Sequence, residues 1–148
     1  MTVSNLLCRE STLIVLPWPD READQRGQDV RGRYVELFVL PILGPTATWL
    51  LRRLVDGLEA FPDGYELDLA ETAGALGLIH LPERPGPFAK ALDRIVMFGY
   101  ARPMPYGLAV RTHLQSLAVK QINRLPAHLR SLHAEWVPAQ PATGVRTT

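Results

Sequence analysis

Hydrophobic residues between positions 45 and 60 recur every three or four residues, which is the spacing of a helix that buries one face. Pro45 suits the first turn of such a helix, because proline has no amide hydrogen to lose there. Trp49 borders the apolar stripe, so we expect its large ring to belong to the core. The stripe consists of Leu50, Leu51, Leu54, Val55 and Leu58. The pattern predicts one long helix.

Two shorter helical patterns follow within residues 66–112. The first helix is predicted to begin at Asp68, because an aspartate three residues ahead of Glu71 matches a capping box. The second is predicted to begin near Pro87, after a proline-rich loop. The face of the first helix predicted to be buried carries Leu69, Ala73 and Leu76, and that of the second carries Phe88, Leu92, Ile95 and Gly99. The opposite face of the second helix carries Lys90, Asp93, Arg94 and Met97.

A proline- and glycine-rich reversal comes after the second helix and predicts a β-hairpin over residues 102–112. Tyr106 and Gly107 are its expected tip. Because side chains alternate along a strand, Arg111 is expected to point outward, on the face opposite Leu108.

These segments resemble the winged helix-turn-helix family in the spacing of LAETAGAL, in the F-x-x-x-L-x-x-I pattern of the next helix and in its ending F-G-Y-A. The resemblance implies a mainly α fold with a small β-hairpin, in which residues 34–113 form a winged helix-turn-helix core. Residues 1–33 would be an N-terminal extension with a short strand and a linker, residues 114–137 C-terminal helices, and residues 138–148 a flexible tail. The hairpin would be the wing. Binding of double-stranded DNA, most often for transcriptional regulation, is the function that the resemblance implies.

Five basic residues are the candidate DNA-binding side chains under this resemblance. The two on the second helix would face base edges, with Met97 touching a thymine methyl group or covering the helix end. The other three would hold phosphates beside the groove, which fixes position without reading sequence. The candidates are Arg84, Lys90, Arg94, Arg102 and Arg111.

Asp93 lies between the two cations of the second helix and keeps a second hypothesis open. A winged-helix fold also serves as a protein–protein interaction module without DNA binding, since fold alone does not assign function. A protein partner, or a second copy in a homodimer, would then bind through the N-terminal segment or the C-terminal helices.

Charge is segregated along the chain although the net charge is only +1. Residues 54–83 hold seven acids and no lysine or arginine, whereas residues 84–133 hold eight basic residues and one acid. The basic half favours a polyanionic partner. The alternative is that the two blocks compensate each other across the folded surface, where exposed ion pairs contribute little.

Several segments outside the two helices have patterns of their own. Residues 12–18 predict a strand, residues 19–33 a polar loop, and residues 34–43 a helix that Pro41 breaks or kinks. Residues 65–69 predict a short strand that pairs with the hairpin.

Structure is also predicted for the C-terminal region and for the turn that precedes the strand at residues 65–69. Phe61 to Gly64 has the composition of a turn. Pro126 is predicted to divide residues 114–137 into two helices, with Ser116 as a possible cap of the first.

The sequence contains no recognisable set of catalytic, metal-binding or phosphate-binding residues. Cys8 is the single cysteine, so no internal disulfide or cysteine metal cluster is expected. His128 and His133 are five residues apart, which does not place both on one helical face. Neither of the common glycine-rich phosphate-binding loops is present. We therefore expect no enzyme activity, no cofactor and no metal. The single cysteine favours a reducing cytoplasm, and the absence of a long apolar run predicts no membrane partner.

Overall fold

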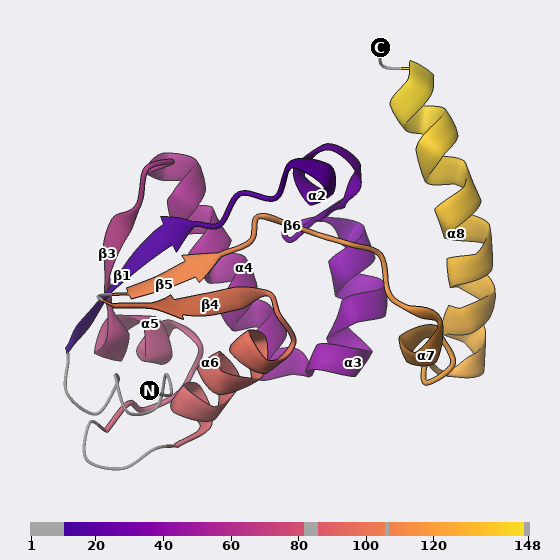
Figure 1. Ribbon diagram of the computed structural model, residues 1–148. Helices are drawn as coiled ribbons and strands as arrows, with labels where there is room; N and C mark the ends of the chain where they lie inside the picture. The colour runs from indigo at the N-terminus through magenta and orange to yellow at the C-terminus, as the bar shows by residue number, and fades with distance from the viewer. Residues whose placement is uncertain (1–10, 82–85, 106, 147–148) are drawn as a thin grey trace.

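The computed structural model describes residues 11–81, 86–105 and 107–146, with side chains as far as Trp136. Its centre is a four-stranded mixed sheet with the strand order β3-β1-β5-β4 (Figure 1). A two-stranded sheet pairs β2 (Gln28–Asp29) with β6 (His113–Leu114). The strands of the larger sheet are β1 (Thr12–Pro17), β3 (Tyr65–Asp68), β4 (Ala101–Met104) and β5 (Gly107–Val110). The chain is an α/β protein with a small mixed sheet, which is more β structure than the predicted hairpin and two short strands.

Strand β1 confirms the strand predicted near residues 12–18 and lies inside the sheet. It pairs antiparallel with β3 and parallel with β5, so both of its edges are hydrogen-bonded. Leu13 and Val15 are buried, as expected for alternate residues that face a core. This part of the predicted N-terminal extension, residues 1–33, therefore belongs to the central sheet. The predicted pairing of β3 with the hairpin is wrong, because β1 lies between them.

Helix α4 (Pro45–Ala60) packs on β1 and β5 and contacts helix α6 (Pro87–Met97). It confirms the long helix predicted for residues 45–60, and every residue of the predicted apolar stripe is buried. Burial of this continuous stripe is the main reason that the helix is stable, since most helical stability in proteins comes from packing.

The two shorter predicted helices are confirmed. Helix α5 (Leu69–Ala75) begins after Asp68, whose side chain accepts a hydrogen bond from the amide of Glu71 at 2.8 Å. Helix α6 begins at Pro87 and buries its predicted apolar face. Gly99 differs, because it lies beyond the end of α6 and is exposed with φ at +78°. Glycine adopts this left-handed conformation without strain, so Gly99 ends the helix rather than packing in the core.

Strands β4 and β5 confirm the hairpin, with Met104 opposite Gly107. Its predicted tip at Tyr106 lies outside the described residues. The expected division of β5 into a buried and an open face is wrong, because Leu108 and Ala109 are only 1% and 4% exposed. Strand β5 pairs on both edges and is covered on both faces, as an inner strand of a small core must be.

Residues 34–43 form two consecutive short helical segments, η1 (Val35–Val39) and α3 (Leu40–Leu43). The first is a π-helix, in which the amide of Leu40 donates to the carbonyl of Val35. Pro41 has no amide hydrogen for the carbonyl four residues earlier, and the wider π turn accommodates this loss. The predicted break at Pro41 is therefore a change of helix type.

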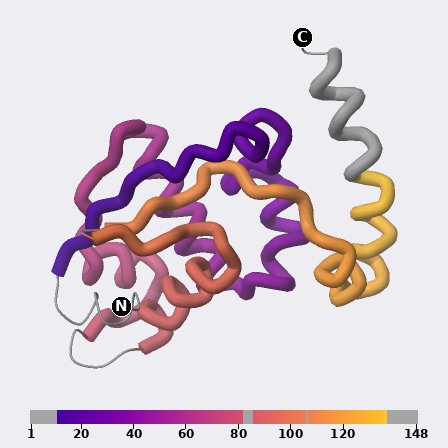
Figure 2. Tube along the Cα trace, viewed as in Figure 1, coloured from indigo at the N-terminus to yellow at the C-terminus, as the bar shows by residue number. Residues whose placement is uncertain are grey.

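Residues 19–33, predicted as a loop, contain helix α2 (Arg21–Arg26) and strand β2. Asp20 caps α2 by accepting a hydrogen bond from the amide of Ala23 at 3.2 Å. Ala23 is buried. Figure 2 shows this segment beside the chain that leaves β5, and the amide of Val30 donates to the carbonyl of Thr112 at 3.0 Å. The short helix was missed because a single capped turn leaves little hydrophobic periodicity.

The C-terminal region divides at Pro126 as predicted, into α7 (Val119–Ile122) and α8 (Ala127–Arg146). Ser116 is not the cap of α7. The first turn begins at Ala118, whose amide donates to the side chain of Gln121 at 3.0 Å. The predicted flexible tail, residues 138–148, lies beyond the last described side chain.

A buried polar contact joins α8 to η1. The amide of Leu117 donates to the hydroxyl oxygen of Tyr34 at 2.9 Å, and this hydroxyl lies 2.7 Å from Nε2 of His133. Phe38 packs edge-on against His133 and Trp136, with ring centroids 4.9 and 5.8 Å away. Tyr34 therefore connects three segments that are far apart in the sequence.

Candidate nucleic-acid interface

The outward face of α6 carries the residues that the sequence predicts there. Lys90, Arg94 and Met97 are exposed, and Met97 is 70% exposed. Lys90 forms no ion pair with any residue that the structure describes. Asp93 is half-buried on the same face and takes part in an interaction of its own.

The guanidinium group of Arg94 is hydrogen-bonded to the protein backbone. Its Nε donates to the carbonyl of Leu43, and an Nη donates to the carbonyl of Ile42 at 2.9 Å. Both carbonyls lie at the end of α3, where the last helical carbonyls lack intrahelical donors. The guanidinium also lies 5.0 Å from the centre of the Phe98 ring. Arg94 therefore caps α3 and ties it to α6, a role that the helical pattern alone does not reveal.

The exposed face of α6 continues onto the first turns of α4. Lys90 and Arg94 line a shallow hollow together with Pro45 and Thr46. Pro45 and Thr46 also line a second, neighbouring hollow. This second hollow has a volume of about 410 Å³ and is lined by Pro45, Thr46, Trp49, Arg53, Ala75 and Leu76.

Trp49 is 55% exposed, which corrects the expectation that it belongs to the core. The signal was present in the sequence: at about 100° per residue, Trp49 lies on the same side of α4 as Arg53 and Asp56, four and seven residues later. The guanidinium of Arg52 lies 5.3 Å from the centre of the indole ring. Trp49 is a surface aromatic residue with cationic neighbours.

Arg111 does not point outward from the hairpin as predicted. Its side chain is 21% exposed and forms an ion pair with Asp20 at 2.9 Å. Its Nε donates to the carbonyl of Gly99 at 3.1 Å, and its guanidinium lies 3.7 Å from the centre of the Trp18 ring. Arg111 therefore joins the ends of β1, β5 and α6, because the parallel pairing of β1 with β5 brings Trp18 and Asp20 alongside it.

The remaining two candidates differ in their surroundings. Arg102 is exposed on the edge strand β4, with its guanidinium 5.1 Å from the centre of the Trp18 ring. Arg84 lies outside the described residues. The structure thus gathers Lys90 with Arg94 on α6, and Arg102 with Arg111 around Trp18.

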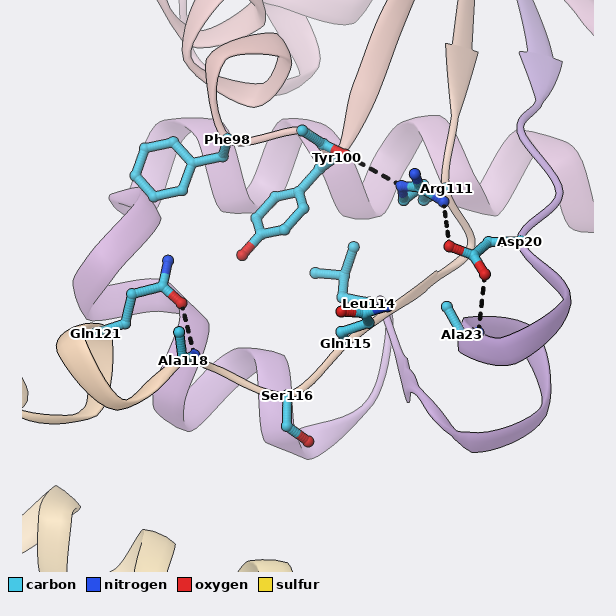
Figure 3. A pocket seen from close by; sticks show the side chains of 11 residues that line it. Asp20, Ala23, Phe98, Tyr100, Arg111, Leu114, Gln115, Ser116, Ala118 and Gln121 are labelled. Atoms are coloured by element: carbon cyan, nitrogen blue, oxygen red, sulfur yellow. Dashed lines mark hydrogen bonds and ion pairs between the residues drawn. The ribbon is translucent and has the colours of Figure 1, made fainter.

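A polar pocket of about 300 Å³ opens beside the end of α6 (Figure 3). Its walls come from the α6–β4 turn, the start of α2, the chain after β5 and α7. Figure 3 shows the hydroxyl of Tyr100 pointing into the space next to Gln121. That hydroxyl forms no hydrogen bond with any residue that the structure describes. No local pattern in the sequence predicts this pocket, because its walls meet only in the folded chain.

Burial raises the pKa of Tyr100 to about 12, with a smaller contribution from Tyr34. Desolvation penalises the phenolate, so the Tyr100 hydroxyl keeps its proton at neutral pH and acts as a hydrogen-bond donor. Desolvation also lowers the pKa of His133 and raises that of Tyr34.

No protein-family model, curated protein or solved structure matches this chain. Within the described residues, no helix is both long enough and apolar enough to cross a membrane. The same part of the chain contains no group of three or more His, Cys, Asp and Glu side chains arranged to hold a metal ion.

Proposed function

We propose that this protein binds double-stranded DNA through a winged-helix unit and acts in transcriptional regulation. The observation that carries the proposal is the order α4, β3, α5, α6, β4, β5: a helix, a strand, two helices and a hairpin. This is the order of elements that the winged helix-turn-helix resemblance implies, and it has α6 in the place of the recognition helix. The insertion of β1 between β3 and β5 would be this chain's departure from that arrangement.

The side chains of α6 support a groove contact of limited size. Lys90 is exposed and would contact phosphate or a base edge, and Met97, two turns further along the same face, would contact an apolar base edge. Arg94 would hold α6 in position while its charge adds to the local potential. Arg102 would contact a phosphate from the edge of the hairpin.

The proposal predicts salt-dependent duplex binding. Fluorescence anisotropy with a random-sequence duplex at two salt concentrations should show binding that weakens steeply as salt rises, because each phosphate contact releases counterions. Lys90→Glu should weaken binding and reduce the magnitude of the salt slope by about 1. Lys120→Glu on α7 is a matched charge reversal at another exposed lysine and should change the affinity less.

Two results would refute the DNA proposal. One is the absence of duplex binding by the wild-type chain at low salt. The other is equal affinity of the Lys90→Glu and wild-type chains when circular dichroism shows both folded, which would place any DNA contact elsewhere.

A protein-interaction module is the second candidate, favoured by the exposed Trp49. Tryptophan is enriched among the residues that anchor protein interfaces, and Trp49 is 55% exposed beside a hollow. Trp49→Ala should then abolish recovery of a stoichiometric protein partner by crosslinking while leaving duplex binding unchanged. Recovery of the same partner by both chains would refute this candidate.

A further inference from the structure

The geometry points to a second binding site, in the pocket beside the end of α6, for a small aliphatic monocarboxylate. This site goes beyond DNA binding and does not depend on it. The walls of the pocket come from segments that are far apart in the sequence, and three of these walls carry hydrogen-bond donors that are not fully used (Figure 3).

Three donors line the pocket and have N–H or O–H groups to spare. The hydroxyl of Tyr100 points into the space and keeps its proton at neutral pH. Gln121 uses its Oε1 to accept from the amide of Ala118, which leaves its Nε2 as a donor. Arg111 uses Nε and one Nη, which leaves the other Nη. A ligand that satisfies these groups must offer acceptors.

The carboxylate on the walls already accepts hydrogen bonds through both of its oxygens. Asp20 accepts from Ala23 through one carboxylate oxygen and from Arg111 through the other. Because Asp20 balances the charge of Arg111, the pair attracts an anion only weakly through its net charge. An anion is held here mainly by directed hydrogen bonds, and hydrogen bonds to an ionised carboxylate are stronger than those to a neutral carbonyl.

The size and the apolar part of the pocket restrict the rest of the ligand. A volume of about 300 Å³ lies at the small end of the range for ligand pockets in proteins, which is about 300–1,000 Å³. Phe98, Leu114 and Ala118 provide apolar surface in the lining. A short aliphatic chain with one carboxylate fits this volume and these apolar residues, whereas a dicarboxylate would bring a second negative charge into a pocket that already holds Asp20.

Butyrate is the probe for this site, and butyramide is its uncharged control of the same shape. Titration of the full chain, followed by amide NMR shifts, should give saturable changes at Tyr100, Arg111 and Gln121 with butyrate. A dissociation constant on the order of 1 mM is expected, because so small a ligand makes few contacts. Butyramide should bind at least tenfold more weakly.

Two variants test the donors directly. Tyr100→Phe removes the hydroxyl and should weaken butyrate binding tenfold or more. Gln121→Glu keeps an oxygen for the amide of Ala118 but replaces the free donor by a negative charge, so saturable binding should be lost. Tyr65→Phe is the matched control, because its hydroxyl donates to the carbonyl of Leu54 outside the pocket.

Different results would overturn different parts of the proposal. Equal binding of butyrate and butyramide would exclude a carboxylate ligand. Unchanged binding by folded Tyr100→Phe and Gln121→Glu chains would place the ligand elsewhere. The absence of saturable shifts at tens of millimolar butyrate would refute the site itself. None of these results bears on duplex binding, which is measured without the carboxylate.

Discussion

Replacement of Tyr34 by phenylalanine tests the contact that joins α8 to the rest of the chain. The ring of Tyr34 is buried and packs 5.0 Å, centre to centre, from the ring of Phe38. Phenylalanine keeps that ring, so the variant creates almost no cavity. The change removes one hydroxyl that accepts from the amide of Leu117 at 2.9 Å and lies 2.7 Å from Nε2 of His133.

The expected loss of unfolding free energy follows from these two contacts. A neutral hydrogen bond contributes about 1 kcal/mol net, and a buried donor left without an acceptor costs about 1–3 kcal/mol. The amide of Leu117 is such a donor, since its bond to Tyr34 is buried. Tyr34→Phe should therefore destabilise the protein by about 2–3 kcal/mol, because the two effects overlap.

Urea unfolding followed by circular dichroism measures this loss. At a urea dependence of about 2 kcal/mol per molar, the midpoint should fall by about 1 M. Tyr65→Phe is the control, because its hydroxyl makes one part-buried bond, to the carbonyl of Leu54 at 2.7 Å, and it should lose only about 1 kcal/mol. A Tyr34→Phe chain as stable as the wild type, or more stable than Tyr65→Phe, would refute this account of the contact.

Four further changes have defined outcomes. Burial lowers the pKa of His133 below its value of 6.5 in the unfolded chain. The contribution of His133 to stability is therefore present above pH 6.5 and is lost as the pH falls toward the folded pKa. Urea midpoints measured at a series of pH values should fall less on acidification in His133→Gln than in the wild type. Asp68→Ala should cost about 1 kcal/mol by removing the cap of α5, and Asp68→Asn should restore most of it in the same assay. Leu92→Ala should cost about 3 kcal/mol in urea unfolding, since Leu92 is 0% exposed. Arg94→Lys keeps the charge but not the paired bonds to α3, so it should lower the unfolding midpoint while changing duplex affinity less than Lys90→Glu does.

The features that were predicted correctly from the sequence are those set by residues close together in the chain. Asp68 and Glu71 are three residues apart, and their spacing locates the start of α5. The spacing of Leu50 and Leu54 likewise predicts the buried side of α4. Such patterns can be recognised from the geometry of a single helix, without knowledge of which segment packs against it.

The order of the strands is not available from such patterns. The run of β-branched residues near Val15 predicts a strand, but nothing local states that β3 and β5 lie on either side of it. The environments of Arg111 and Tyr100 follow from that order, since the pairing of β1 with β5 brings Asp20 beside Arg111. The polar pocket could not be predicted for the same reason.

The arginines of the candidate site could not be assigned from the sequence for the same reason. The basic half of the chain suggests a charged surface, but several of its arginines are hydrogen-bonded to backbone carbonyls in the folded chain. Arg94 donates to the end of α3, Arg111 to the carbonyl of Gly99, and Arg130 to the carbonyl of Leu125 at 2.9 Å. A planar guanidinium suits this task because it offers several fixed donors to carbonyls that the ends of helices and turns leave without partners. Lys90 makes no such bond with any described residue, so its ammonium group is available to an external anion. The DNA proposal therefore depends on Lys90 far more than on the count of basic residues, so reversal of its charge is the sharpest test of the interface.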